Sequence, residues 1–140
     1  MAKWYKQITA SDAQRKTAGN QRGGITLVKA GFPIDSQTYF RNDLFGTADW
    51  QPSKTATGED REIAKVIMDT DILGKTYGQL TFDISYSPVR EADQDNYTCI
   101  LHTAPLTDLF YSQDMEGNWL SIERTDKGSH TLSITNDKPA

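Results

Sequence analysis

Two polar segments carry side chains suited to molecular recognition, and the first spans residues 11–24. It gathers amide and basic side chains together with Gly19, Gly23 and Gly24. Glycine lets backbone N–H groups approach a phosphate closely. Arg and Lys match guanine O6 and N7, while Gln and Asn match adenine N6 and N7. The candidate DNA-contacting residues of this segment are Gln14, Arg15, Lys16, Asn20, Gln21 and Arg22.

The second polar segment covers residues 88–96. Its candidate DNA-contacting residues are Arg90, Asp93, Gln94, Asp95 and Asn96. The basic and amide side chains can read purine edges, and the two aspartates can accept from cytosine N4–H. Carboxylates repel phosphates, so these aspartates suit DNA only where they reach base edges or orient Arg90. The alternative is that both segments are ordinary solvated turns, in which Asn, Gln, Asp and Gly are common.

Catalytic and metal-binding patterns are absent from the sequence. His102 and His130 stand 28 residues apart and Cys99 is the one cysteine, so no zinc-ligand spacing occurs. We expect both histidines to be structural residues of strands. No phosphate-binding glycine loop, dinucleotide fingerprint or nucleophile-elbow pattern occurs either. The sequence therefore predicts neither a metal nor a cofactor.

Nuclease signatures are also missing. Metal-dependent nucleases commonly place a carboxylate two residues before a lysine, and no lysine of this chain has Asp or Glu at that position. The phospholipase-D-type alternative needs His-x-Lys, but Ala104 and Leu132 stand two residues after the histidines. We therefore predict that this chain does not itself cut DNA.

Charge is distributed unevenly along the chain. The 140 residues carry a net charge of -4, yet residues 1–30 hold six basic residues against Asp12 alone, a net of +5, which leaves -9 for the rest. Such a division can present a basic face to a polyanion, although a chance cluster on a solvated surface would look the same. The length predicts one domain over residues 1–140. The lone cysteine, the lack of an apolar leader and the lack of a membrane-length apolar stretch predict a cytoplasmic protein away from the membrane.

Alternating apolar and polar residues predict an all-β fold with short helices. The predicted strands are residues 4–9, 24–29, 62–69, 79–87, 97–102, 119–124 and 130–135. Residues 126–128 should form a hairpin turn in which Gly128 supplies a positive φ, and the strands at 79–87 and 97–102 should pair. Short helical turns are predicted at 11–14 and 105–111, and an exposed loop at 50–60. Most aromatic residues of these strands should pack in the core.

The order of these features resembles that of B3-type DNA-binding domains. Residues 6–14, with Ile8-Thr9-Ala10-Ser11-Asp12, are similar to the signature that follows the first strand of that family. Residues 78–102 resemble the hairpin of its bacterial branch, the B3-like domains of type II restriction endonucleases. Residues 39–46 and 120–124 fall in comparable places. The resemblance implies a seven-stranded open DNA-binding pseudobarrel whose two arms, here residues 14–22 and 90–96, clamp the major groove.

The sequence departs from the family pattern at two places, and both bear on which DNA sequence would be recognised. Plant members continue the first arm with a basic and apolar stretch, whereas this chain has Thr17-Ala18-Gly19-Asn20-Gln21. The acidic Asp93 and Asp95 leave the target sequence open.

The resemblance implies a sequence-specific binder of double-stranded DNA, the recognition domain of a restriction endonuclease with an attached or associated nuclease domain. The lysines expected to attract phosphates are Lys3, Lys6, Lys16 and Lys29. Two alternatives stay open at this point. One is a β-barrel ligand or carbohydrate-binding module, which would line a cleft with exposed aromatics. The other is an assembly module, which would show a large apolar patch.

Overall fold

The computed structural model describes residues 2–9, 24–27, 39–54, 58–87, 99–106, 108–109 and 115–138, and it shows an all-β fold with short helical turns. The strands are β1 (Ala2–Gln7), β2 (Gly24–Thr26), β3 (Gln51–Lys54), β4 (Asp60–Ile72), β5 (Lys75–Tyr86), β6 (Ile100–His102), β7 (Trp119–Arg124) and β8 (His130–Thr135). The helical turns are η1 (Phe40–Leu44), a π-helix, and η2 (Ala104–Leu106), a 3-10 helix.

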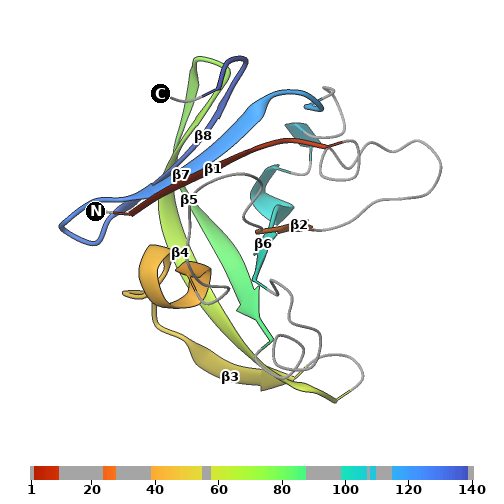
Figure 1. The fold of residues 1–140 in the computed structure, drawn as a ribbon, viewed down its shortest axis with the longest axis vertical. Coiled ribbons are helices and arrows are strands. Elements are labelled where there is room, and N and C mark those ends of the chain that lie inside the picture. The colour runs from red at the N-terminus through yellow and green to blue at the C-terminus, as the bar shows by residue number, and fades with distance from the viewer. Residues whose placement is uncertain are drawn as a thin grey trace.

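One curled sheet contains all of these strands (Figure 1). Its strand order is β1-β7-β8-β4-β5-β6-β2, and β3 pairs with β4 off this path. The sheet forms an open half-barrel, in agreement with the predicted fold class. Each of the seven predicted strands has a counterpart, and the predicted pairing of the strands at 79–87 and 97–102 is confirmed by the antiparallel β5–β6 ladder.

The β4–β5 hairpin contains the two longest strands of the half-barrel. Ala64, Val66 and Met68 are buried on its inner face, whereas the alternate residues Lys65 and Ile67 are exposed on its outer face. This period of two is what a strand with one face on the core requires. The hairpin turns at Leu73 and Gly74, whose φ angles are 50° and 86°. Two consecutive positive φ values are typical of the turn whose twist matches that of the flanking strands.

The C-terminal hairpin joins this unit to β1. β7 and β8 pair antiparallel, and β8 also pairs in parallel with β4. Gly128 has a φ of 85°, as predicted, and its N–H donates to the carbonyl of Thr125 across 2.9 Å. β1 then pairs antiparallel with β7 and ends the sheet on that side. The hairpin therefore bridges the longest strand to the edge strand that precedes the first polar segment.

The inner face of the curled sheet holds the core. The largest fully buried side chains are Trp4, Phe40, Phe45, Phe82, Ile8, Ile25, Leu27, Leu44, Met68, Ile84 and Leu101. Trp4 packs edge-on against Phe40, with ring centroids 5.3 Å apart, which fixes η1 against β1. The prediction that most strand aromatics serve the core is confirmed for Trp4, Phe82 and Tyr86.

One local prediction was wrong in part, one helix was not predicted, and one predicted helical turn agrees with the residues that the structure describes. Residues 51–54 lie in the predicted exposed loop but form β3, because they pair with β4. The polar residues around Pro52 give no strand signal in the sequence. Proline is tolerated there because β3 is an edge strand. The π-helix η1 has no counterpart among the predicted helices. The short helical turn predicted at residues 105–111 agrees with the structure where it is described, since Ala104–Leu106 form a 3-10 helix and residues 108–109 are helical.

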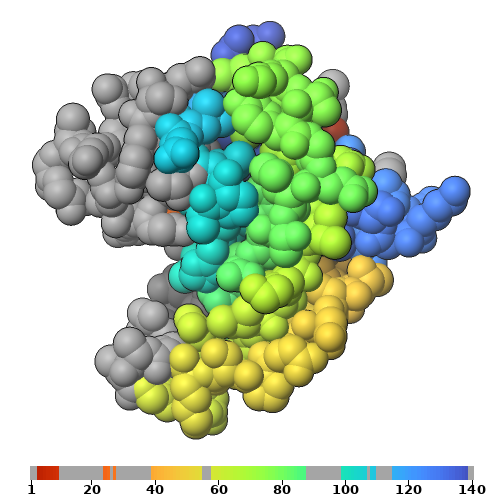
Figure 2. Space-filling view, turned by 180° about the vertical axis from the view of Figure 1, so that it is seen from behind, coloured from red at the N-terminus to blue at the C-terminus, as the bar shows by residue number. Residues whose placement is uncertain are grey.

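The outer face of the sheet is seen from behind in Figure 2. β4 and β5 occupy its middle, with β6 along one side. On the other side, β3 and the β7–β8 turn lie at separate places along β4.

Candidate functional site

The eleven predicted DNA-contacting residues fall outside the described residues. Gln14, Arg15, Lys16, Asn20, Gln21 and Arg22 belong to residues 10–23, and Arg90, Asp93, Gln94, Asp95 and Asn96 belong to residues 88–98. The predicted helical turn at 11–14 also lies there. What the structure does define is the set of strand ends between which these two segments run.

The first segment connects the two ends of the sheet. β1 and β2 are the terminal strands of the order, so residues 10–23 join one edge of the half-barrel to the other. On the β1 side, Ile8 N–H donates to the carbonyl of Asn118 across 2.7 Å, and Gly117 N–H donates to the carbonyl of Ile8 across 2.9 Å. These bonds continue the β1–β7 ladder beyond Gln7 and fix the point from which the segment departs.

The far end of the first segment is fixed at Gly24. This residue begins β2 and lies opposite His102 in β6. A Cβ atom at Gly24 would lie 2.6 Å from Ile100 Cγ2 and 3.0 Å from the carbonyl oxygen of Leu101. Contacts of this length leave no room for a side chain. The second glycine of the Gly23-Gly24 pair therefore has a packing role at the base of the segment.

The second segment starts and ends on the neighbouring strands. It follows β5, which ends at Tyr86, and it precedes Cys99 and β6. Leu27 N–H donates to the carbonyl of Cys99 across 2.8 Å, which extends the β2–β6 ladder by one step. Adjacent strands lie about 4.8 Å apart. The second polar segment and the C-terminal end of the first are therefore anchored on the β5–β6–β2 side of the half-barrel, whereas the first segment starts from β1 at the other end of the sheet.

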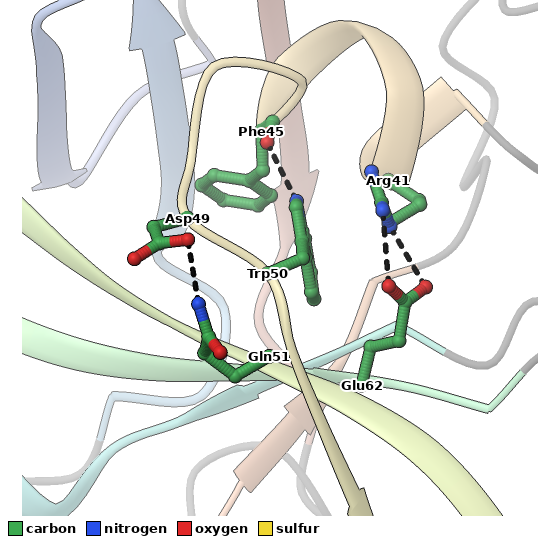
Figure 3. A network of polar contacts seen from close by, with 6 residues as sticks. All are labelled: Arg41, Phe45, Asp49, Trp50, Gln51 and Glu62. Atoms are coloured by element: carbon green, nitrogen blue, oxygen red, sulfur yellow. Dashed lines mark hydrogen bonds and ion pairs between the residues drawn. The ribbon is translucent and has the colours of Figure 1, made fainter.

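A network of polar and aromatic contacts joins η1 to the strands from which the second segment departs (Figure 3). Arg41 of η1 makes two parallel hydrogen bonds to Glu62 of β4, from Nε to Oε1 and from Nη2 to Oε2, each 3.1 Å long. The Arg41 guanidinium carbon lies 4.6 Å from the ring centroid of Trp50. The Trp50 Nε1–H donates to the carbonyl of Phe45 across 2.9 Å. A paired, stacked guanidinium of this kind is well suited to hold its neighbours in place.

This network reaches the last residue of β5. Trp50 contacts Tyr86 edge-on, with ring centroids 6.4 Å apart, and Tyr86 is the cross-strand partner of Glu62. The position of η1 is thus coupled to the strand end from which residues 88–98 begin. Sequence reasoning missed this network because a lone Arg and a Trp placed in a polar stretch give no periodic signal.

The Ser85, His102 and Asp83 side chains form the arrangement closest to a catalytic one. The Ser85 Oγ lies 2.9 Å from His102 Nε2, and Asp83 is electrostatically coupled to the ring. Burial is the main cause that lowers the pKa of His102. Ser85 is only 3% exposed, however, and Asp83 is paired with Lys65 at 2.9 Å. A buried hydroxyl beside a carboxylate already occupied by lysine is poorly placed for nucleophilic attack.

His130 has structural contacts, as expected for a histidine in a strand. Its Nε2 lies 2.7 Å from the carbonyl oxygen of Leu44, and its ring stacks on Phe45 with centroids 5.3 Å apart. Because a carbonyl only accepts, Nε2 must carry the proton. Burial lowers the pKa of His130, and the hydrogen bond to Leu44 opposes that shift.

The two depressed histidine pKa values predict acid sensitivity. The unfolded chain binds these protons near the usual pKa of 6.5, whereas the folded chain binds them only at lower pH. The contribution of these histidines to the free energy of unfolding should therefore be fully present above pH 6.5. It should decrease as the pH falls below 6.5 and become constant below the pKa values of the folded state. We expect a lower urea midpoint at about pH 5.5 than at about pH 7.5. His130→Gln retains an N–H donor, and its urea midpoint should decrease less between these two pH values. An equal decrease would show that His130 does not cause the pH dependence.

Two of the four predicted phosphate-attracting lysines are described. Lys3 is half-exposed, and its Nζ lies 3.7 Å from Glu123 Oε1, so its charge is partly offset. Lys6 is only 7% exposed, because it points to the same inner face of the sheet as Trp4 and Ile8. A side chain buried on that face is poorly placed to contact a phosphate. Lys16 and Lys29 lie outside the described residues.

Within the described part of the chain, no three His, Cys, Asp or Glu side chains are grouped to hold a metal ion. None of the helices described there is long and apolar enough to cross a membrane. Comparison of the chain with family models, curated proteins and solved structures finds no match, so the likeness to B3-type domains rests on the residues of the sequence.

Proposed function

We propose that the chain is a sequence-specific double-stranded DNA-binding domain that reads the major groove with residues 14–22 and 90–96. We further propose that it is the recognition domain of a cytoplasmic restriction endonuclease whose cutting is done by an attached or associated nuclease domain. The observation that carries the proposal is that the C-terminal end of residues 10–23 and both ends of residues 88–98 are held by the adjacent strands β2, β6 and β5. A clamp needs two reading loops held by one rigid support.

Charge and residue type support the same proposal. The basic excess of the chain lies in residues 1–30, and residues 10–23 contain three of its six basic side chains. Amide and guanidinium groups that can read bases are present in both segments. Phosphate attraction would come from Lys16, Lys29 and the partly offset Lys3, and it would weaken with salt as counterions are released.

The decisive test is a selection of bound duplexes from a random oligonucleotide pool at moderate salt. We expect a short enriched motif, with binding to a scrambled duplex weaker by at least about a thousandfold. Failure to enrich any motif, together with no shift of any duplex at low salt, would overturn the proposal. A shift without an enriched motif would restrict the domain to sequence-independent binding.

A further inference from the structure

β4 has a gap in its strand pairing on the side away from β5. β3 pairs with residues 60–63 and β8 pairs with residues 68–72. Among the described residues, no strand pairs with residues 64–67 on that side. An unpaired strand edge presents backbone N–H and C=O groups that can bind another extended chain. The gap lies along β4 between the stretches that pair with β3 and with β8, and residues 47–49 line a depression there together with residues 65–67.

Two depressions meet at this gap. One, of about 290 Å³, is lined by residues 47–49, residues 65–67, Gly128 and His130. The other, of about 370 Å³, is lined by Asp49, Gln51, Pro52, Ser53, Ile63 and Lys65. Asp49 and Lys65 line both, so the depressions are neighbours. We call the pair the β4 trough. Each depression is large enough for a side chain of a docking segment.

The β4 trough is lined by a mixture of polar and apolar side chains, in which Asp49 is the one negative charge and Pro52, Ile63 and Ile67 are apolar. Ile67 is 58% exposed, more than any other large apolar side chain in the described ranges. The Lys65 Nζ lies 2.9 Å from Asp83 Oδ1, so the positive charge in the trough is already paired. Asp49 accepts a 2.7 Å hydrogen bond from the Gln51 amide, as Figure 3 shows, and no described basic side chain pairs with it. The trough therefore offers a carboxylate near the apolar side chains of Pro52, Ile63 and Ile67.

We propose that the β4 trough docks an extended segment of another protein, with a basic side chain at Asp49 and apolar side chains on either side of it. The alkyl stem of Lys or Arg can lie on the apolar side chains of the trough while its charge reaches the carboxylate. The net charge of -9 over residues 31–140 favours a basic partner. DNA is not the expected occupant of the trough, because the Asp49 carboxylate would repel its phosphates.

The probe for this surface is a phage-displayed library of random nine-residue peptides, selected on the full chain. We expect enriched peptides with a basic residue flanked by apolar residues, and synthetic copies should shift the backbone NMR signals of residues 47–49 and 65–67. Ile67→Asp and Asp49→Lys should each weaken those peptides by at least about tenfold. Asp49→Asn removes the charge with the least risk to folding and should weaken them in the same direction.

Leu73→Asp is the matched control, because among the described residues Leu73 is the other exposed large apolar side chain, and it lies at the β4–β5 turn, outside the trough. It should leave peptide binding unchanged. The proposal is overturned if no peptide is enriched above the level found on the Asp49→Lys, Ile67→Asp double variant. Enrichment of acidic peptides, NMR shifts confined to other residues, or equal losses with Leu73→Asp would also overturn it. These outcomes do not depend on DNA binding.

Discussion

Gly46→Ala is expected to destabilise the fold by more than about 3 kcal/mol. A Cβ atom at this position would lie 2.0 Å from the carbonyl oxygen of Asn42 and 2.9 Å from its carbonyl carbon. Both atoms are backbone, so no side-chain rotation can relieve the contact. The π-helix η1 would have to be rebuilt.

The cost is large because η1 holds several other contacts. Its closing bond runs from Phe45 N–H to the carbonyl of Phe40 across 2.9 Å. The carbonyls of Leu44 and Phe45 accept from His130 and Trp50. Phe40, Leu44 and Phe45 are fully buried. A shift of this turn would therefore disturb the core and the network that reaches Tyr86 together.

Urea denaturation of Gly46→Ala and a matched Gly58→Ala variant would measure this effect. Gly58 has a φ of 89° with no atom within 4 Å of a built Cβ, so alanine there should cost only the left-handed strain, about 1–2 kcal/mol. Free energies of unfolding that agree within about 0.5 kcal/mol for the two variants would show that the turn relaxes more easily than its geometry implies.

Arg90→Ala is expected to relax specificity at one base pair of the selected DNA site, a loss of about 1–3 kcal/mol, or roughly 5- to 150-fold, on that site alone. A bidentate contact to a base edge distinguishes base pairs, whereas binding to random duplex depends on phosphate contacts. This prediction rests on the proposed function, and Arg90 itself lies outside the described residues.

Lys16→Ala is the matched comparison within the other arm. It should weaken all duplexes similarly and reduce the slope of log affinity against log salt by about 0.9, because one phosphate contact is lost. Fluorescence anisotropy with the selected site, single-base variants and random duplex at several salt concentrations would separate the two. Equal losses on cognate and random DNA for Arg90→Ala would contradict its proposed role as a base reader.

Local pattern was enough to predict seven of the eight described strands, the shared buried face of Phe82, Ile84 and Tyr86, and the last hairpin turn. The alternation around Phe82 and Ile84 and the positive φ of Gly128 follow from neighbours along the chain, so no tertiary information is needed. The two polar segments could also be selected from residue type. Their anchoring on neighbouring strands could not, because strand order between distant parts of a chain has no local signal.

Only the tertiary structure decided the remaining features. β3 forms because β4 offers it a partner, in spite of Pro52. Lys6 is buried because its place in the alternation of β1 outweighs its charge. Arg41, Trp50 and Glu62 meet because η1 packs on the sheet, and the β4 trough exists because β3 and β8 pair with separate stretches of one strand. The sequence by itself determined seven of the strands and the residue types on which the proposed DNA recognition rests, since both depend on single residues and short spacings. The fold decided which of those residues meet, which are buried and which edges stay open, since these depend on contacts between segments far apart in the chain.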